Sequence, residues 1–251
     1  MLSIIQVGHN DASDRYIRNK IAAIETAGMV VEVINLPENT STEDILSCIR
    51  AADIKDGNSA IMVQLPLPPQ IEKDIVLRNI PVEKDIDGLN PHSNYKPLTP
   101  CAIMRWLEKY KLQGRNVVIF GKSDLVGKPL ANMLMEAGAT VTVMNSKTTE
   151  WFRELHCQFA DIIVVATGKT NTFKKNYVSD IIVQTVIDVG INRNDEGKLC
   201  GDVSAEAREL IGEHHGTCTP VPGGVGKWTV NELVLRLKEM ENKEKYNENQ
   251  D

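Results

Sequence analysis

The chain has 251 residues, of which 42% are hydrophobic and only 5% aromatic, so it can bury a sizeable core that is mainly aliphatic. Its 34 acidic residues outnumber its 28 Lys and Arg, which gives a formal net charge of −6. This balance argues against a nucleic-acid partner, because phosphate contacts require clustered Lys and Arg. No apolar run reaches the roughly 18 residues of a membrane span, and residues 1–7 do not resemble a secretory signal. We therefore expect neither a nucleic-acid nor a membrane partner.

The five cysteines are scattered along the chain and form no CxxC pair. Their odd number leaves at least one thiol unpaired in any disulfide scheme. Such a pattern is typical of reduced thiols in the cytosol rather than of a disulfide framework or a metal site. The sequence thus predicts a cytoplasmic protein without a structural metal.

Strands and helices alternate along the first half of the chain. The expected strands are residues 2–8, 29–36 and 59–65, and the expected helices run from Asp11 or Ser13 to Gly28, from a capping box of Thr40 and Glu43 to about Ile54, and from Ile71 to Ile80. This alternation predicts a parallel sheet with helices on both faces.

A polar stretch with four prolines, residues 81–100, interrupts the alternation and marks a domain boundary. The second half then resumes it, with strands at 116–120, 139–144, 161–166 and 185–189 and helices at 101–112, 128–137, 149–159 and 229–240. A Pro/Gly loop at 219–226 precedes the last helix, and the charged residues 241–251 are expected to fray. The sequence predicts an α/β protein of two domains.

The segment from Gly121 to Gly127 follows a strand and opens a helix, which is the context of a dinucleotide-binding fingerprint. The match is imperfect, because Ser123 and Val126 stand where the second and third glycines would be. An ordinary strand–helix turn explains the same residues equally well. Gly121 nevertheless permits a tight turn, and the helix N-terminus supplies amide groups for a phosphate.

The next strand in the chain ends at residues 144–148 without the carboxylate that holds a ribose 2′-hydroxyl in NAD sites. Ser146, Lys147 and Lys122 could instead bind a 2′-phosphate, which a carboxylate would repel. Both lysines could also be ordinary solvated loop residues. Their expected position beside the fingerprint turn favours NADP.

The first half carries a second group of polar candidates. Tyr16 and Lys20 lie four apart on one helix, and hence on one face, although an amphipathic helix needs no more than that. Gln64 ends an apolar strand, at the edge where parallel sheets bind ligands. Asp87 lies in a loop where a plain turn aspartate is also possible. The loop 219–226 is stiffened by prolines, and its glycines let a ligand approach the backbone.

Together these motifs resemble the bifunctional methylenetetrahydrofolate dehydrogenase/methenyltetrahydrofolate cyclohydrolase family over nearly the whole chain. The resemblance is carried by Ala12-Ser13 with Tyr16 and Lys20, by segments 63–68, 83–89, 121–129, 186–192 and 201–203, and by Thr219-Pro-Val-Pro-Gly-Gly-Val-Gly226. It implies a three-layer folate-binding catalytic domain (residues 1–100 plus 228–251) and a Rossmann-type NADP-binding domain (residues 101–227), with a cleft between them. It also implies a homodimer.

The resemblance assigns roles to particular residues. Lys20 is the key cyclohydrolase residue, Tyr16 packs on the tetrahydrofolate substrate, Gln64 assists the lysine and Asp87 holds the pterin. The NADP positions are Gly121, Lys122, Ser123, Ser146 and Ile191, with Lys147 added by the argument above, and the substrate loop contains Pro222, Gly223 and Gly224. The implied reactions are oxidation of 5,10-methylenetetrahydrofolate with NADP and hydrolysis of the product to 10-formyltetrahydrofolate.

The sequence departs from the family pattern at four places. The helix before the first strand is not present, and the loop after Asp87 is shorter than usual. Lys122 replaces a common Arg, and Lys227-Trp228 stands where Pro-Met is typical. Two alternatives remain open: a dehydrogenase without cyclohydrolase activity, which the retained Lys20 and Gln64 disfavour, and a non-catalytic protein that binds NADP or folate. Whether Lys20 transfers protons or only positions water also remains open.

Overall fold

A computed structural model describes residues 1–8 and 11–248 of the chain. The chain forms two compact units, one made of Met1–Leu98 with Val230–Asp251 and the other of Thr99–Thr229. Each unit contains a parallel β-sheet with helices packed on it, so the predicted two-domain α/β class is confirmed.

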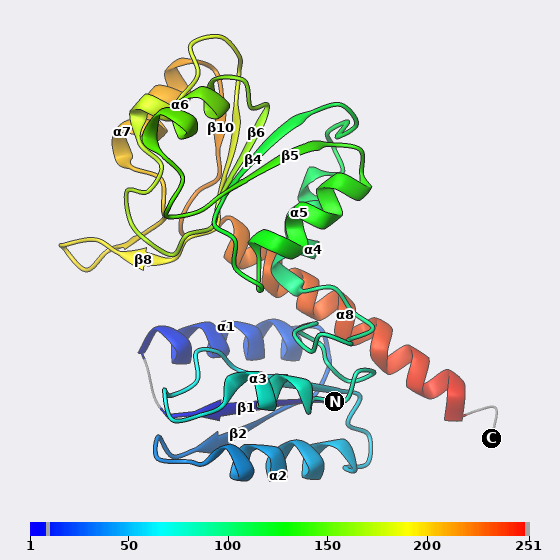
Figure 1. Cartoon of the computed structure of the whole chain (residues 1–251). Helices are drawn as coiled ribbons and strands as arrows, with labels where there is room; N and C mark the ends of the chain where they lie inside the picture. The colour runs from blue at the N-terminus through cyan, green and yellow to red at the C-terminus, as the bar shows by residue number, and fades with distance from the viewer. Residues whose placement is uncertain (9–10, 249–251) are drawn as a thin grey trace. The chain divides into compact units, whose positions relative to one another are not determined.

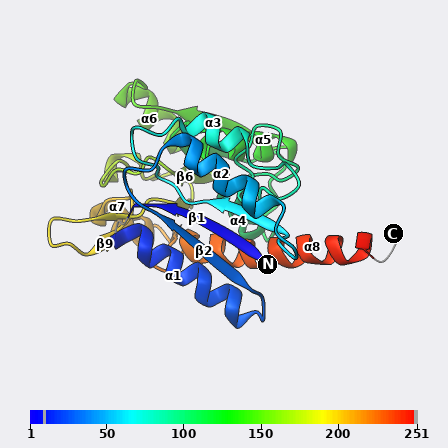
Figure 2. The ribbon, with the colours of Figure 1, turned by 90° about the horizontal axis from the view of Figure 1, so that it is seen from below.

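The first unit is built on a three-stranded parallel sheet with the strand order β2-β1-β3. Its strands are β1 (Leu2–Val7), β2 (Val31–Leu36) and β3 (Ala60–Val63), and its helices are α1 (Asp11–Thr26), α2 (Thr42–Asp53), α3 (Lys73–Arg78) and the part of α8 (Val225–Glu248) from Val230 onward. β1 and β2 run side by side, with α1 and α2 on opposite faces of them (Figures 1 and 2).

Alternation of side chains along β1 separates the two faces of this sheet. Leu2 and Ile4 join a buried cluster with α1 and α8, whereas Ile5 and Val7 join another with α2 and α3. The same alternation along β3 places Met62 in the first cluster. Side chains on this face of β3, such as Met62, therefore point toward α1.

The second unit contains a five-stranded parallel sheet with the order β10-β7-β6-β4-β5. Its elements are α4 (Leu98–Leu107), β4 (Asn116–Phe120), α5 (Gly127–Glu136), β5 (Thr140–Met144), α6 (Glu150–Gln158), β6 (Ile162–Val165), η1 (Lys175–Tyr177), β7 (Thr185–Asp188), the hairpin β8 (Asn192–Arg193) and β9 (Leu199–Cys200), α7 (Ala205–Glu213) and β10 (Thr217–Cys218). The strand order reverses at β4, which has β5 on one side and β6 on the other. Ligands of such sheets bind at the carboxyl ends of the strands beside this reversal.

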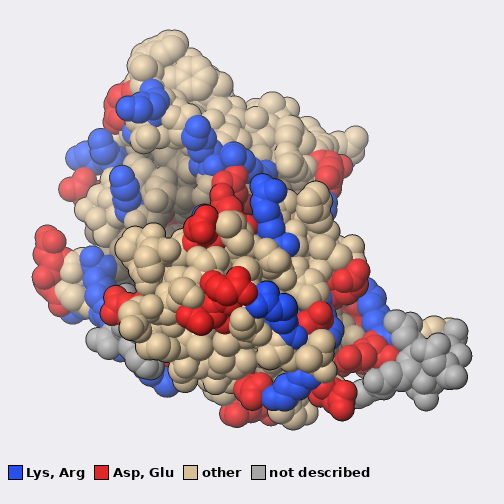
Figure 3. Space-filling model, turned by 60° about the horizontal axis from the view of Figure 1, so that its bottom comes forward, with Lys and Arg blue, Asp and Glu red and all other residues tan. Residues whose placement is uncertain are grey.

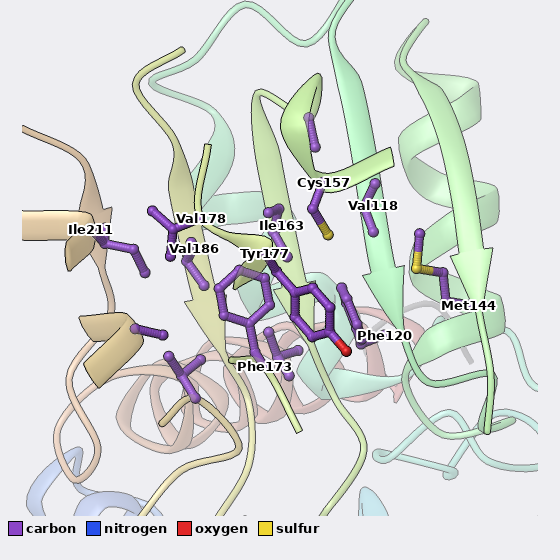
Figure 4. Close-up of a cluster of buried hydrophobic side chains, with 14 residues drawn as sticks. Val118, Phe120, Met144, Cys157, Ile163, Phe173, Tyr177, Val178, Val186 and Ile211 are labelled. Carbon is purple, nitrogen blue, oxygen red and sulfur yellow. The ribbon is translucent and has the colours of Figure 1, made fainter. Parts of the chain in front are cut away.

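Both faces of the second sheet are covered. α4 and α5 pack on one face, and α6, α7 and η1 on the other. On the latter face the rings of Phe120, Phe173 and Tyr177 form a cluster with centroids 5.5–5.6 Å apart (Figure 4). Because Phe120 is the last residue of β4, this cluster fixes the point at which the following turn leaves the sheet.

The capping box of α2 lies one residue later than the sequence analysis predicted. Ser41, not Thr40, is the N-cap: its Oγ accepts a hydrogen bond from the Asp44 amide at 3.2 Å, and the Asp44 carboxylate accepts one from the Ser41 amide at 3.0 Å. The Thr40 hydroxyl instead donates to the Pro37 carbonyl at 2.6 Å. The prediction of Thr40 and Glu43 was therefore wrong, because two overlapping hydroxyl–carboxylate pairs compete for the same motif.

The last helix was also mispredicted. α8 begins at Val225 and continues to Glu248, so the expected fraying from residue 241 was wrong as far as residue 248. Charged residues with good helix propensity extend it, with an ion pair of 2.6 Å between Glu239 and Lys243 one turn apart. α4 starts and ends earlier than the predicted 101–112, since Pro100 is tolerated in a first helical turn. The short elements α7, η1, β8, β9 and β10 were not predicted.

On the face shown in Figure 3, Lys and Arg are interspersed with Asp and Glu. Over the described ranges, 1–8 and 11–248, no helix is both long and apolar enough to cross a membrane.

Candidate active site

Lys20 lies in a buried site of the first unit, on the face of α1 that packs against the sheet. Its side chain is only 4% exposed. The Lys20 Nζ donates to Gln64 Oε1 at 3.0 Å and lies 3.2 Å from the Met62 sulfur. It also lies 4.6 Å from the centre of the Tyr16 ring, one turn earlier on α1. The structure thus brings together Tyr16, Lys20 and Gln64, and adds Met62, which the sequence analysis missed.

The Gln64 amide is held in one orientation by its own backbone neighbour. Its Nε2 donates to the Leu65 carbonyl at 2.6 Å, which turns Oε1 toward Lys20. Gln64 directly follows β3, at the carboxyl edge of the sheet where it was expected. The Lys20 amine, which is nearly shielded from water, therefore has a neutral amide oxygen as its hydrogen-bond acceptor.

A tight turn after α3 presents Asp87, and Asp85 organises it. The buried Asp85 carboxylate accepts hydrogen bonds from the amides of Gly88 at 3.1 Å and Asn90 at 2.7 Å. These bonds fix the backbone on both sides of Asp87. Asp87 itself is partly buried. Two aspartates in a D-x-D pattern were visible in the sequence, but only the structure shows that the first one builds the turn for the second.

Burial and charge act in opposite directions on Lys20 and Asp87. Burial lowers the pKa of Lys20, and the nearby Asp87 partly offsets this effect. Burial raises the pKa of Asp87, and the charges of Lys20 and Arg236 oppose that rise. The charges of Lys20 and Asp87 therefore influence each other, and the lowered pKa makes the neutral form of Lys20 more accessible than that of an exposed lysine.

In the second unit, the turn after β4 approaches β6 so closely that only glycine fits. Gly121 has φ of +112°, and a Cβ there would lie 2.2 Å from the Ala166 carbonyl oxygen. A Cβ on Gly127 would lie 2.0 Å from the Gly121 carbonyl oxygen. The Gly121 amide donates to the Met144 carbonyl at 2.9 Å, which ties the turn to the end of β5. Strand, turn and helix start are therefore packed as a dinucleotide-binding turn requires.

The polar candidates of this unit lie around that turn and the end of β5. Lys122, Ser123, Ser146 and Lys147 are all exposed. In the segment 145–148, the Asn145 amide donates to the Thr148 hydroxyl at 3.0 Å and the Lys147 amide donates to Asn145 Oδ1 at 2.8 Å. The segment contains no carboxylate. Two lysines and two hydroxyl groups without an acid fit a dinucleotide that carries a 2′-phosphate.

A buried carboxylate network after β7 was not assigned from the sequence. Asp188 accepts from the amides of Asp202 at 2.8 Å and Val203 at 3.1 Å, and it is ion-paired with Arg208. Asp202 in turn accepts from the Thr167 amide at 2.6 Å. The network fixes the loops after β6 and β7, the second of which exposes Ile191 (57% exposed). The quoted motifs 186–192 and 201–203 contained these aspartates, but their pairing depends on the fold.

The predicted loop 219–226 is shorter in the structure, because its last two residues begin α8. Arg208 holds its start by donating to the Thr219 carbonyl at 2.7 Å. Pro222 and Gly223 are exposed, whereas Gly224 is buried. Across the ranges 1–8 and 11–248, no group of three or more His, Cys, Asp or Glu side chains is arranged to hold a metal ion.

Two family models match most of the chain. Residues 1–87 match the catalytic domain of tetrahydrofolate dehydrogenase/cyclohydrolase, and residues 97–245 match its NAD(P)-binding domain. The chain belongs to the tetrahydrofolate dehydrogenase/cyclohydrolase family. Its Lys20 site lies within the part matched by the first model, and its Gly121 turn within the second.

Individual relatives agree with this family assignment. A bifunctional protein FolD from Lysinibacillus sphaericus is 41% identical over 96% of this chain and 87% of its own length. The FolD methylenetetrahydrofolate dehydrogenase/cyclohydrolase structure from Campylobacter jejuni has a TM-score of 0.89 at 37% identity, covering 97% of this chain and 88% of that one. A FolD structure from Trypanosoma brucei, complexed with NADP and an inhibitor, has a TM-score of 0.87 at 30% identity, covering 97% and 86%.

The close approach at Gly121 predicts that Gly121→Ala lowers the free energy of unfolding strongly. The matched control is Gly168→Ala, because Gly168 also has a positive φ, of +65°, but a Cβ there meets nothing within 4 Å. The control should lower the free energy of unfolding only by the strain of a left-handed backbone, about 1–2 kcal/mol. Gly121→Ala should lower it clearly further, since β4 or β6 must move. Urea unfolding of both variants measures this, and equal losses would contradict the proposed close packing.

Proposed function

We propose that this chain oxidises 5,10-methylenetetrahydrofolate with NADP and then hydrolyses 5,10-methenyltetrahydrofolate to 10-formyltetrahydrofolate. It is thus both an oxidoreductase and a hydrolase of tetrahydrofolate interconversion. The observation that carries the second activity is the buried Lys20, bonded to Gln64 and electrostatically coupled to Asp87. The retained Lys20 and Gln64 disfavour a dehydrogenase without cyclohydrolase activity.

The oxidation step needs alignment of two reactants more than acid–base chemistry. NADP supplies the acceptor for the hydride that leaves the one-carbon bridge of the substrate. The Gly121 turn and Ser123 would hold the pyrophosphate side of the dinucleotide, and Ser146 with Lys122 and Lys147 its 2′-phosphate. Ile191 would pack on the dinucleotide, and Pro222, Gly223 and Gly224 would lie against the folate. The NADP complex of the T. brucei relative supports this cofactor.

The hydrolysis step needs a group that manages protons. Water attacks the carbon of the methenyl cation and must lose a proton as the ring opens. Lys20 in its neutral form would accept that proton, and both burial and the adjacent substrate cation favour the neutral form. Gln64 would orient the amine, Tyr16 would pack on the folate and Asp87 would bind the pterin. Each role is a proposal for the residue at that position.

We also propose a cytoplasmic location and a homodimer. All five cysteines are free thiols, which fits a reducing compartment. For the dimer, the candidate surface is β5 with the outer side of α6. β5 is an edge strand without a charged residue or proline, the usual devices that keep an edge from pairing.

The surface around β5 is unusually apolar. Val143, Trp151, Phe152, Leu155 and Phe159 are between 37% and 68% exposed. A hollow of about 400 Å³, lined by Val118, Thr142, Leu155 and Phe159 among others, opens between the sheet and α6. The hollow lies at the amino ends of β4 and β5, away from the ligand-binding end. A two-fold axis perpendicular to the sheet would pair β5 with β5 of a second copy.

The cofactor proposal predicts a higher kcat/KM with NADP than with NAD. A single charge-assisted contact to the 2′-phosphate is worth roughly 1.5–3 kcal/mol, and for a lysine we expect the lower end, about tenfold. Lys147→Gln should reduce the preference by about that factor, whereas Lys175→Gln, at an exposed lysine of η1, should leave it unchanged. Steady-state kinetics with NADP and with NAD measures the two kcat/KM values for each variant. Equal or better kcat/KM with NAD for the parent chain would refute the proposal.

The dimer proposal predicts that a charge on the β5 edge separates the copies. Val143→Lys should convert a dimer into a monomer, because antiparallel pairing of β5 with its copy would bring the two introduced lysines together on neighbouring strands. Ile54→Lys is the matched control, since Ile54 is 83% exposed at the end of α2 in the other unit. Analytical ultracentrifugation over a range of concentrations measures the result. A parent chain that stays monomeric throughout would rule out the homodimer.

The role of Lys20 is tested by Lys20→Met, which keeps the apolar stem and removes the ammonium group. Oxidation of methylenetetrahydrofolate should persist in part, since it depends on alignment. Hydrolysis of the methenyl compound should fall by roughly the hundred- to ten-thousandfold typical of losing an acid–base group. Absorbance should therefore show methenyltetrahydrofolate accumulating. Tyr16→Phe, which keeps the ring, should have a smaller effect. Hydrolysis at the parent rate in Lys20→Met would leave the cyclohydrolase proposal without its residue.

A further inference from the structure

Arg236 is a buried cation that none of the roles above uses. It lies on α8 within the first unit and is only 6% exposed, beside Leu233, Leu237 and Met240 of the core. A charge in such surroundings is costly unless it is paired and hydrogen-bonded. Arginine stays protonated even there, so its charge is a fixed feature of the site.

Two contacts join Arg236 to the segment that carries Asp87. Its guanidinium donates to the Ile86 carbonyl at 2.8 Å, and it lies 5.4 Å from the centre of the Tyr95 ring. Ile86 directly precedes Asp87, and the charge of Arg236 acts on the Asp87 carboxyl. Helix α8 therefore brings a positive charge next to the segment of Asp87, whose own charge acts on Lys20.

Besides the Arg236 bond to the Ile86 carbonyl, the turn has its own internal hydrogen bonds. Asp85 holds the amides of Gly88 and Asn90, and Asn90 donates to the Ile80 carbonyl at 2.8 Å. Replacing Arg236 should thus change the charge around Asp87 more than the backbone that presents it.

We propose that Arg236 is a positioning residue for the Lys20 site: its buried charge, held at the Ile86 carbonyl next to Asp87, favours the form of the Lys20–Asp87 pair that has given up its proton. This inference rests on the proposed cyclohydrolase role of Lys20 and adds a residue to it. Its sequence signal is an arginine at a position of α8 that the apolar spacing of Leu233 and Leu237 would assign to the core.

The direction of the effect follows from counting charges. The pair can carry one proton between an amine and a carboxylate, or none. Whichever group holds that proton, the fixed charge of Arg236 stabilises the form without it, because that form has a net negative charge. Other ionisable groups lie around these residues: Tyr16 contacts Lys20, the charge of Asp87 acts on Asp85, and Tyr95 contacts Arg236. The buried Glu232 lies one turn before Arg236 on α8. All of them are unchanged when only Arg236 is replaced.

The test compares Arg236→Gln with Arg236→Lys, and with Lys238→Gln as a control on the exposed side of α8. Protein labelled with carbon-13 at lysine Cε is titrated, and the Lys20 signal is identified by its absence in Lys20→Met. Arg236→Gln should raise the Lys20 titration midpoint by about one pH unit, and Arg236→Lys should restore most of the parent value. The pH profile of methenyltetrahydrofolate hydrolysis should move upward with it, with about a tenfold loss near pH 7 that is recovered at higher pH.

The two measurements separate this inference from the proposed function. An unchanged Lys20 midpoint in Arg236→Gln, with the variant folded by circular dichroism, overturns the role of Arg236 whatever the activity. A raised KM for folate with an unshifted pH profile overturns it as well, since that would mean a binding role alone. A shifted midpoint in a chain that does not hydrolyse the methenyl compound supports the role of Arg236 and refutes the cyclohydrolase proposal instead. If Arg236→Gln does not fold, the Arg236→Lys midpoint decides: a value unlike that of the parent counts against a simple charge effect.

Discussion

The amine of Lys20 is almost completely shielded from water, and much of the first unit is arranged around that fact. A buried ammonium group is costly without partners, and β3 and the turn around Asp87 supply them. The Gln64 oxygen comes from the end of β3, the Met62 sulfur from the same strand, and the opposing charge of Asp87 from the turn that Asp85 holds. Alternation along β3 is therefore more than a packing pattern, because a shift of one residue would turn Gln64 away from α1.

The second unit depends on a close approach of backbones rather than on a buried charge. The carbonyl of Ala166 occupies the space that any side chain at position 121 would need, so the chain just after β4 can approach the end of β6 this closely only with glycine there. The aromatic cluster beneath Phe120 and the carboxylate network of Asp188 and Asp202 hold the neighbouring loops in the same region. Rigid packing on one side of the turn leaves its other side, with Lys122 and Ser123, facing solvent.

Periodic patterns in the sequence were sufficient to predict the alternating strands and helices, because burial on a strand or helix leaves a direct trace in the chain. Ends of elements were harder: Ser41 and Thr40 offer overlapping caps, and the polar end of α8 looked like a tail although its ion pairs continue the helix. Contacts between distant positions were beyond reach. Asp188 with Asp202, and Arg236 with the Ile86 carbonyl, are pairs that only the fold creates.

Helix α8 belongs to both units, and this has a consequence for how the chain folds as it is made. The face of β1 with Leu2 and Ile4 is covered in part by Leu233, Leu237 and Met240, which lie more than 200 positions later by residue number. On the ribosome, the second unit (residues 99–229) can therefore be synthesised in full while the first sheet still exposes apolar surface. A nascent chain of this kind needs protection from aggregation until α8 emerges. The segment that finally closes the core is also the one that delivers Arg236, so the first unit gains its last buried charge only as its core closes.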